Sequence, residues 1–432
     1  MKKILFAVIM ALTLWGCSED RNTILKVYNW ADYIDEELLG EFEEWYFEQT
    51  GENVEIIYQT FDINETMLSK IELGHEDYDV VCPSDYIIER MLKNDLLLPI
   101  ERNFGKTPDY IGCISPYIEE KFAEIEGHGK DARDYSVGYM WGTVGLIYNS
   151  KYVDADQATS WNVLRNPDYS GKVLMKDAFR DVYTALLNAL NREAIDRGEK
   201  DPHTLTFDTS DESIALVEGF LNSFKESISG WEADFGKEQM TKELAWLNLS
   251  WSGDAQWAIE EAAEMGVELE YTIPVEGSTV WFDGWVIPKY AKNIKAASYF
   301  INFMCMPENA LRNMDMTGYV STIGGAEVLE AMSDPEEYEP VDVSYFFGEE
   351  AAASCVNPIM YPDRATVERC VMMHDTDTEA LLKMWSRVKG ANASAWTYIL
   401  IFIVLGGLIF AVFMKYYRKN YRRRKYRRSS RR

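Results

Sequence analysis

Histidine and cysteine are scarce in this sequence, with four and six residues respectively among 432. The histidines stand far apart, and neither they nor the cysteines have the spacing of a metal site. The nucleophile motif Gly-x-Ser-x-Gly is absent, and no histidine pairs convincingly with a cysteine. These absences predict a chain without a structural zinc, without a cofactor and without catalytic residues.

The low cysteine count also excludes a dense disulfide framework. Cys82 follows an apolar run and is predicted to be a small core residue. Cys355 and Cys370 are candidates for a bridge in an oxidising compartment. The sequence leaves their pairing open, because it does not show whether their geometry permits a bond.

Residues 1–17 have the pattern of a lipoprotein signal. Lys2 and Lys3 precede an apolar run, and the run ends in Gly16 directly before Cys17. In such a signal the peptide is cleaved before the cysteine, so we predict lipidation of Cys17. An ordinary signal peptide or an N-terminal anchor helix is the alternative.

A second membrane signal lies near the other end of the chain. Residues 396–414 carry no charge, and about 19 residues at 1.5 Å each come close to spanning a hydrocarbon core of about 30 Å. Residues 415–432 hold eleven lysines and arginines and no acid, which is typical of a cytoplasmic tail. We therefore predict a transmembrane helix at 396–414 and a periplasmic body anchored to the inner membrane.

The body between these segments is strongly acidic. Eleven of the 43 lysines and arginines belong to the tail, so residues 1–414 hold 32 of them against 71 aspartates and glutamates. Such a surface repels nucleic acid and attracts small cations, so we expect no nucleic-acid partner.

Aromatic residues and acids stand together in several short segments. These segments are 28–33 (YNWADY), 84–86 (SDY), 251–254 (WSGD) and 281–285 (WFDGW). Aromatic faces attract an ammonium group by roughly 0.5–2 kcal/mol each, and a carboxylate adds a charge-assisted hydrogen bond. The segments therefore predict a small organic amine as ligand.

Strand and helix signals alternate along the body. Apolar runs at 24–29, 54–58 and 78–82 predict strands, and a helical pattern follows each of them. This order predicts an α/β fold of open parallel sheets flanked by helices, in which ligands bind beyond the carboxyl ends of the strands.

The length of the body predicts two lobes around a cleft, because roughly 370 residues exceed a comfortable single core. An extended segment at 137–149 predicts the crossover into the second lobe, and a strand at 280–287 predicts the return. We assign residues 24–138 and 282–326 to lobe 1, and residues 139–281 and 327–390 to lobe 2.

The order of these segments resembles a known family. The matching segments are 27–33 (VYNWADY), 64–67 (NETM), 78–84 (YDVVCPS), 139–142 (YMWG), Asp283 and 301–303 (INF). They resemble the spermidine/putrescine-binding proteins of polyamine ABC importers over nearly all of residues 24–390. The resemblance implies the two-lobed periplasmic-binding-protein fold and hinged closure on an extended polyamine. It also implies a monomeric receptor whose partners are an inner-membrane permease and its cytoplasmic ATPase.

Carried over residue by residue, the resemblance implies one set of ligand-binding residues. They are Trp30, Asp32, Tyr33, Ser84, Asp181, Trp251, Asp254, Trp281, Asp283 and Tyr319. Carboxylates suit the ammonium ends of a polyamine, and aromatic walls suit its methylene stem. We expect Asp283 to be the main ammonium partner and Asp181 to receive the opposite end. Asp32 and Asp254 are expected to be further acceptors, and Trp251 and Trp281 to enclose the stem.

Departures from the family pattern bear on selectivity. Ala31, Ala178 and Met373 stand where relatives often carry a hydroxyl, an acid and an amide respectively. Together with Asp254 beside Trp251, these departures favour putrescine over spermidine.

Two other functions compete with that of a transport receptor. An enzyme on a similar scaffold, of the thiaminase type, requires a cysteine nucleophile in the cleft, and the sequence supports this poorly. A membrane-tethered polyamine sensor requires a partner protein, because residues 415–432 are too short for a signalling domain. We therefore predict the polyamine-binding component of an importer.

Overall fold

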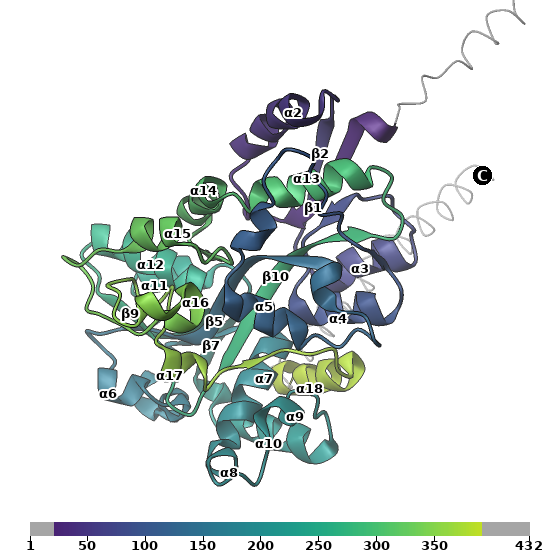
Figure 1. The fold of residues 1–432 in the computed structure, drawn as a ribbon. Coiled ribbons are helices and arrows are strands. Elements are labelled where there is room, and N and C mark those ends of the chain that lie inside the picture. Colours follow the sequence, from purple (N-terminus) through teal and green to yellow (C-terminus); the bar gives the residue numbers. More distant parts are fainter. Residues whose placement is uncertain (1–20, 391–432) are drawn as a thin grey trace, which may run out of the picture.

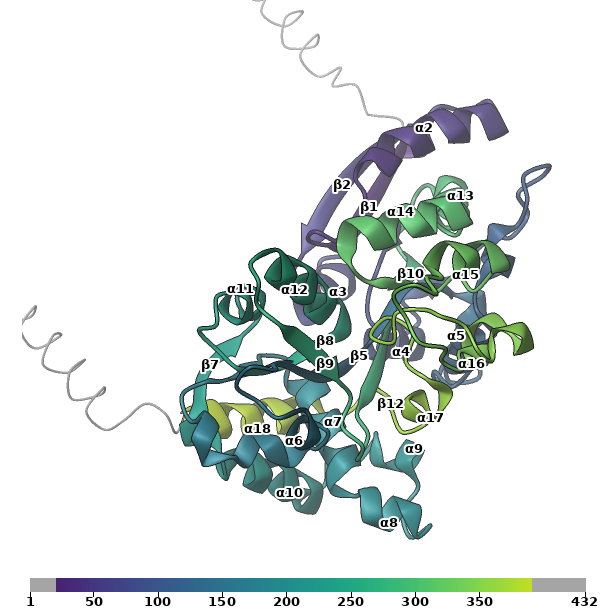
Figure 2. The same ribbon diagram turned by 90° about the vertical axis from the view of Figure 1, so that its left-hand side faces the viewer.

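The protein forms two lobes joined by long central strands. The computed structural model describes residues 21–390. Helix α2 (Glu37–Thr50) lies at one end of the molecule and helix α10 (Asp211–Asn222) at the other, with β5 (Ser136–Asn149) and β10 (Thr279–Pro288) between them (Figures 1 and 2).

Within residues 21–390, twelve strands form one mixed sheet. Its main path is β2-β1-β3-β10-β5-β8-β6-β7, with β4 and β12 paired to β10, and β9 and β11 paired to β5. The remaining strands are β1 (Ile24–Trp30), β2 (Glu55–Phe61), β3 (Val80–Val81), β4 (Leu97–Leu98), β6 (Val173–Lys176), β7 (Ile228–Glu232), β8 (Leu247–Trp251), β9 (Leu269–Thr272), β11 (Val320–Ser321) and β12 (Val371–Met372).

The prediction of parallel sheets is right for the outer strands and wrong for the centre. Strands β2, β1 and β3 are parallel, as are β8, β6 and β7. In the centre, β10 is antiparallel to β3 and β5, and β5 is antiparallel to β8. The reason is the path of the chain, which enters the second lobe along β5 and returns along β10 in the opposite direction.

Strand β5 belongs to both lobes. Its residues 136–143 pair with β10, whereas residues 144–148 pair with β8. The two separate sheets expected from the sequence are therefore joined into one continuous hydrogen-bonded sheet. Every residue of β5 and β10 is buried, so any polar side chain in them needs a partner inside the protein or a ligand.

Helices cover the sheet, and the three expected after the first strand signals are confirmed as α2, α3 and α4. Helix α2 buries Leu38, Phe42 and Tyr46 on one face and ends at Gly51, whose φ of 72° suits glycine. The other helices are α3 (Asn64–Glu72), α4 (Asp85–Lys93), α5 (Pro116–Ala123), α6 (Ala155–Ala158), α7 (Phe179–Leu190), α8 (Arg192–Asp196), α9 (Pro202–Leu205), α11 (Gly236–Thr241), α12 (Ser252–Glu264), α13 (Ile294–Met304), α14 (Pro307–Thr317), α15 (Ala326–Met332), α16 (Ser344–Phe347), α17 (Arg364–Val367) and α18 (Thr378–Gly390).

The predictions for both chain ends fall outside the described residues. They concern the signal at 1–17 with Cys17, the helix at 396–414 and the basic tail at 415–432. In the described part, 21–390, no helix combines the length and the apolar character that crossing a bilayer requires.

The described cysteines are all free thiols. Cys82 is fully buried, as its apolar neighbours predict. Cys355 and Cys370, the candidates for a bridge, are not bonded to each other.

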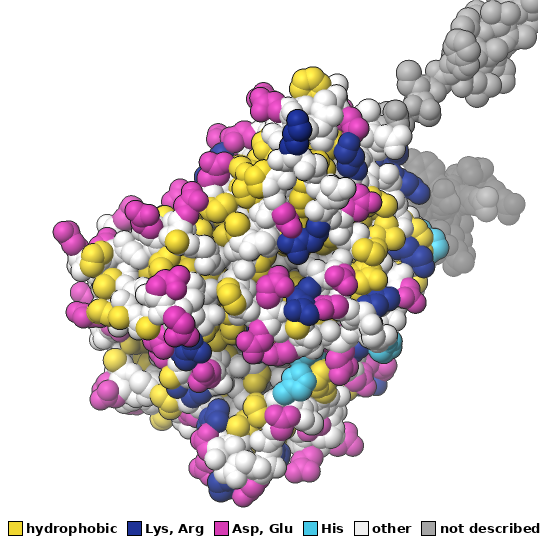
Figure 3. Space-filling model, viewed as in Figure 1, with side chains coloured by type: hydrophobic (Ala, Val, Ile, Leu, Met, Phe, Trp, Pro, Cys, Tyr) yellow, Lys and Arg dark blue, Asp and Glu magenta, His cyan; other side chains and the backbone are white. Residues whose placement is uncertain are grey.

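Acidic side chains are spread over the visible surface, with fewer lysines and arginines among them (Figure 3). This distribution agrees with the acid excess of the sequence and favours the approach of small cations.

Candidate ligand-binding site

Asp283 is an acid in the middle of the buried strand β10, and its side chain is only 6% exposed. The Tyr33 hydroxyl donates a hydrogen bond of 2.9 Å to Oδ2. Among the described residues, Oδ1 has no hydrogen-bond partner, although it is buried. A buried carboxylate oxygen without a partner is unfavourable, so Oδ1 is a position that a ligand cation would stabilise.

Burial also changes the acidity of Asp283. It raises the pKa of the carboxyl to about 7, and the nearby hydroxyls of Ser84 and Tyr33 offset only part of this effect. The Asp181 charge raises the pKa further. No cation among the described residues forms an ion pair with Asp283, so its negative charge is available to a ligand near neutral pH.

Asp181 supplies a second acid from the first turn of α7. The indole Nε1 of Trp251, the last residue of β8, donates a hydrogen bond of 3.1 Å to its Oδ1. Burial raises the pKa of Asp181 to about 6, although this hydrogen bond and the charges of Lys176 and Arg180 lower it. Asp181 is therefore oriented by an aromatic residue that was itself predicted for the site.

Asp85 is a third acid in this region; it belongs to the predicted aromatic and acidic segment 84–86 but not to the ligand-binding set that the resemblance implies. Its side chain is fully buried at the start of α4 and accepts hydrogen bonds from the backbone N–H of Tyr86 and of Phe282. Burial, together with the charges of Asp283 and Asp181, raises its pKa well above the ordinary value. The three acids repel one another, and a bound cation would relieve this repulsion.

Asp254, in contrast, already has cations beside it. The ammonium Nζ of Lys176 lies 2.5 Å from Oδ2, and that of Lys237 lies 3.4 Å from Oδ1. The Tyr319 hydroxyl also donates to Oδ1 at 2.9 Å. Burial alone would raise the pKa of Asp254, but the two lysine charges and these hydrogen bonds hold it below the ordinary value.

Aromatic rings connect the acids. Tyr319 packs edge-on against Trp281 and Tyr33, with ring centroids 5.5 and 5.3 Å apart. Two glycines permit this packing: a Cβ at Gly253 would collide with the ring of Tyr319, and a Cβ at Gly142 with that of Trp281. The rings form a wall of the kind that holds an alkyl chain and attracts a cation.

Two predicted residues are less buried than these acids. Asp32 is exposed at the turn after β1, with a left-handed φ of 51°. Trp30 is half-buried against Phe61, with ring centroids 4.6 Å apart.

Ser84, in contrast, lies beside Asp283. It precedes α4 and forms an antiparallel bridge with Asp283, and the Asn64 amide donates a hydrogen bond of 3.0 Å to the Ser84 hydroxyl. The structure thus brings Ser84 to Asp283 but leaves Asp32 in the solvent.

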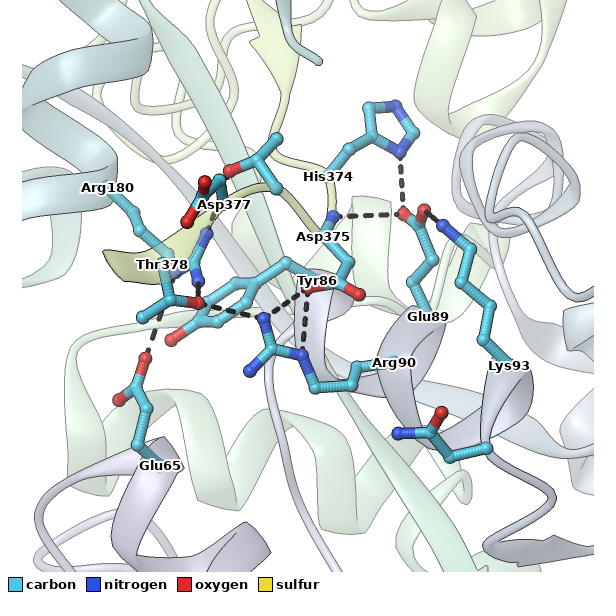
Figure 4. A network of polar contacts seen from close by, with 12 residues as sticks. Glu65, Tyr86, Glu89, Arg90, Lys93, Arg180, His374, Asp375, Asp377 and Thr378 are labelled. Atoms are coloured by element: carbon cyan, nitrogen blue, oxygen red, sulfur yellow. Dashed lines mark hydrogen bonds and ion pairs between the residues drawn. The ribbon is translucent and has the colours of Figure 1, made fainter. Parts of the chain in front are cut away.

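A polar network links the two halves of the sheet close to this site (Figure 4). Arg180 of α7 lies over the ring of Tyr86 on α4, 4.4 Å from its centroid, and 3.8 Å from Glu65 on α3. Arg90 of α4 donates to Asp375, which precedes α18. Because α4 and α7 follow strands on opposite sides of β5 and β10, these contacts hold the lobes together beside Asp181.

The network also contains a buried acid, Glu89, which lies between a histidine and a lysine. His374 Nδ1 lies 2.8 Å from Glu89, whose carboxylate is also 2.5 Å from Lys93 Nζ (Figure 4). Burial raises the pKa of Glu89, but His374 and Lys93 outweigh this effect and hold it below the ordinary value. The C-terminal segment before α18 is thereby tied to α4.

The fold and this site define a solute-binding protein, and the comparisons agree. Residues 38–339 match the family described as bacterial extracellular solute-binding protein, and the chain belongs to this family. A binding protein is therefore confirmed over an enzyme.

Individual relatives lead to a narrower group. The chain is 27% identical over 319 residues to the spermidine/putrescine-binding periplasmic protein of Escherichia coli K12, covering 74% of this chain and 83% of the relative. It is 28% identical over 410 residues to the putrescine-binding periplasmic protein SpuD of Pseudomonas aeruginosa, covering 90% and 98%. The solved structure of the spermidine/putrescine ABC transporter substrate-binding protein PotD from Streptococcus pneumoniae is similar with a TM-score of 0.62 and 30% identity, covering 85% of this chain and 97% of that one. The resemblance and the two-lobed fold expected from the sequence are confirmed.

Proposed function

We propose that the protein captures a polyamine outside the cytoplasm and delivers it to an inner-membrane permease driven by a cytoplasmic ATPase. The observation that carries this proposal is the buried Oδ1 of Asp283, which has no hydrogen-bond partner among residues 21–390 and lies beside aromatic rings. The ligands named for the relatives, putrescine and spermidine, belong to the same class.

In the proposed complex, one ammonium group binds Asp283 and the opposite one binds Asp181. Trp251 and Trp281 cover the methylene stem between them, and each buried CH₂ contributes about 0.8 kcal/mol. Tyr33 and Ser84 position the Asp283 carboxylate. Release of repulsion between the acids adds to the affinity.

Direct titration tests the proposal. The full-length chain, purified in a mild detergent, is titrated calorimetrically with putrescine, spermidine, cadaverine and leucine. We expect micromolar or tighter binding of the diamines, about −8 kcal/mol or more, and no heat with leucine. Binding of the neutral amino acid in preference to the amines, or an amine product of altered mass, would contradict a polyamine receptor.

The lobe boundaries and the membrane attachment are part of the proposal. We propose residues 24–138 and 282–326 as lobe 1 and residues 139–281 and 327–390 as lobe 2, and the change of partners along β5 supports a passage near this boundary. We further propose that Cys17 carries a lipid and that residues 396–414 anchor the periplasmic body in the inner membrane. Such a tether would raise the concentration of the receptor near its permease.

Replacement of Arg180 by glutamine is expected to weaken putrescine binding by about 1–2 kcal/mol, or roughly 5- to 30-fold. The change removes the cation over the Tyr86 ring and the charge opposite Glu65, and it thereby loosens the contact between the lobes. Calorimetry measures the loss. Arg197→Gln is the matched control, because the ion pairs of Arg197 within the described residues, with Glu193 and Glu199, are exposed. Equal affinities for Arg180→Gln and the wild type would show that the network does not support the bound state.

A further inference from the structure

Lys176 is a buried cation in the wall of the proposed site. It is the last residue of β6, and its side chain is only 1% exposed. Its Nζ lies 2.5 Å from Asp254 Oδ2 and 3.5 Å from Glu232 Oε1. The same ammonium lies over the indole of Trp251, 4.1 Å from the ring centroid. A carboxylate and an indole around one ammonium are the contacts that the proposed function assigns to the ligand itself.

The position of Lys176 is fixed from behind. The Glu232 carboxylate accepts hydrogen bonds from the Asn248 side-chain amide at 3.1 Å and from the Gly236 backbone N–H at 3.2 Å. Glu232 is as deeply buried as Lys176. Two hydrogen-bond donors hold Glu232 in place, and Glu232 in turn holds Lys176. Lys176 is therefore a fixed part of the interior of the second lobe and not a mobile surface side chain.

Lys176 is also connected, through a series of direct side-chain contacts, to the residues that we propose bind the ligand. Trp251, beneath its ammonium, donates to Asp181. Asp254, its ion-pair partner, accepts from Tyr319, whose ring packs on Tyr33 and Trp281. Asp181 and Asp283, which lack ion-pair partners among residues 21–390, complete this chain of contacts.

We propose that Lys176 acts as an internal ammonium group that fills a third cation position, so that the site accepts a diamine and rejects a triamine. This inference rests on the proposed function and deepens it. Asp283 and Asp181 receive the two ammonium groups of a diamine, whereas Asp254 is already neutralised. A third ligand ammonium directed at Asp254 would meet the positive charges of Lys176 and Lys237 in a buried environment, where like charges repel strongly.

Replacing Lys176 with methionine tests the inference. Methionine keeps an unbranched apolar side chain and removes the charge, which frees Asp254 for a ligand ammonium. The readout is the ratio of the spermidine and putrescine dissociation constants, measured by calorimetry on the full-length protein in detergent. We expect the wild type to prefer putrescine by about tenfold or more, and Lys176→Met to shift the ratio toward spermidine by at least about tenfold.

Two further variants separate the charge of Lys176 from general damage. Lys176→Arg keeps the positive charge and is expected to keep the wild-type preference. Lys172→Met is the matched control, because Lys172 lies just before β6 over the Trp246 ring, 5.1 Å from its centroid, and donates to a backbone carbonyl. Its ratio should equal that of the wild type. Since Lys176→Met leaves Glu232 buried without its cation, the double variant Lys176→Met/Glu232→Gln is measured as well, with thermal unfolding to confirm folding.

The outcomes distinguish the inference from the function on which it rests. A wild type that binds spermidine as tightly as putrescine overturns the role of Lys176 and leaves the receptor intact. A folded Lys176→Met protein, single or double, with an unchanged ratio does the same. A wild type that binds neither amine overturns the proposed function, and the inference falls with it.

Discussion

Replacement of Asp283 by asparagine is expected to weaken putrescine binding by about 2–5 kcal/mol, roughly 30- to 5000-fold. Asparagine keeps the shape of the side chain but removes the charge, so the ligand ammonium is left in a buried position without its counter-ion. Tyr33 and Ser84 still surround the group, and the loss therefore reports on the charge rather than on packing. Calorimetric titration at pH 8 measures the effect.

The same variant should be more stable than the wild type when no ligand is bound. The folded-state pKa of Asp283 is raised from 3.8 to about 7, so stability that is present at low pH is lost as pH rises through this range. At pH 8 the buried charge destabilises the wild type by roughly 4 kcal/mol, an upper bound by linkage, and asparagine avoids this penalty. A higher Tm with a weaker Kd would identify Asp283 as a binding residue whose charge opposes folding.

Asp32→Asn provides the contrast. Because Asp32 is exposed, we expect its replacement to change the affinity by less than about threefold. A loss as large as that for Asp283→Asn would show that the sequence-based assignment of Asp32 is right and that this turn closes on the ligand. An unchanged affinity in Asp283→Asn would place the ammonium elsewhere.

The second large effect is a loss of affinity on acidification. The ligand ammonium binds the ionised form of Asp283, whose pKa is about 7 in the free protein, while amines of ordinary pKa stay charged throughout. Below pH 7 a proton must leave before the ammonium binds. The affinity should therefore fall by roughly 30-fold between pH 8 and pH 5.5 from Asp283 alone. Asp181, with a pKa of about 6, would add to this fall at the acidic end.

Titrations at several pH values in buffers of different ionisation enthalpy measure both the affinity and the protons released. The Asp283→Asn variant serves as the control, because it should flatten the profile above pH 6 and reduce proton release at pH 6.5. A wild-type affinity that is constant from pH 5.5 to pH 8 would contradict the role of a carboxyl that titrates near neutrality.

Local patterns in the sequence predicted most of the elements that position the site. Apolar spacing located β1, α2 and α4, because a helix or strand that covers a core repeats its buried side with a fixed period. The antiparallel centre was not predictable in this way, since the pairing of β5 with β10 joins segments more than a hundred residues apart. Helical spacing likewise favours a core position for Trp257, yet it is 41% exposed on α12.

The sequence predicted which types of residue lie near Asp283, but it did not predict which of the acids are paired with lysines. Ser84, Tyr33, Trp281 and Tyr319 lie around Asp283, which the matched segments indicated. The partners of Asp254 were missed, because Lys176 ends an apolar strand 78 positions earlier and only folding brings the two together. A lysine closing an otherwise apolar run was the one available signal.

Strand β5 pairs with strands of both lobes, and this limits how the lobes move relative to each other. Backbone hydrogen bonds continue across residues 143 and 144, so one lobe does not slide past the other without breaking them. Torsion of the strand keeps these hydrogen bonds, because paired strands tolerate twist angles over a range of roughly 10–35°. A change in the twist of β5 is therefore the kind of motion for ligand release that this shared strand permits.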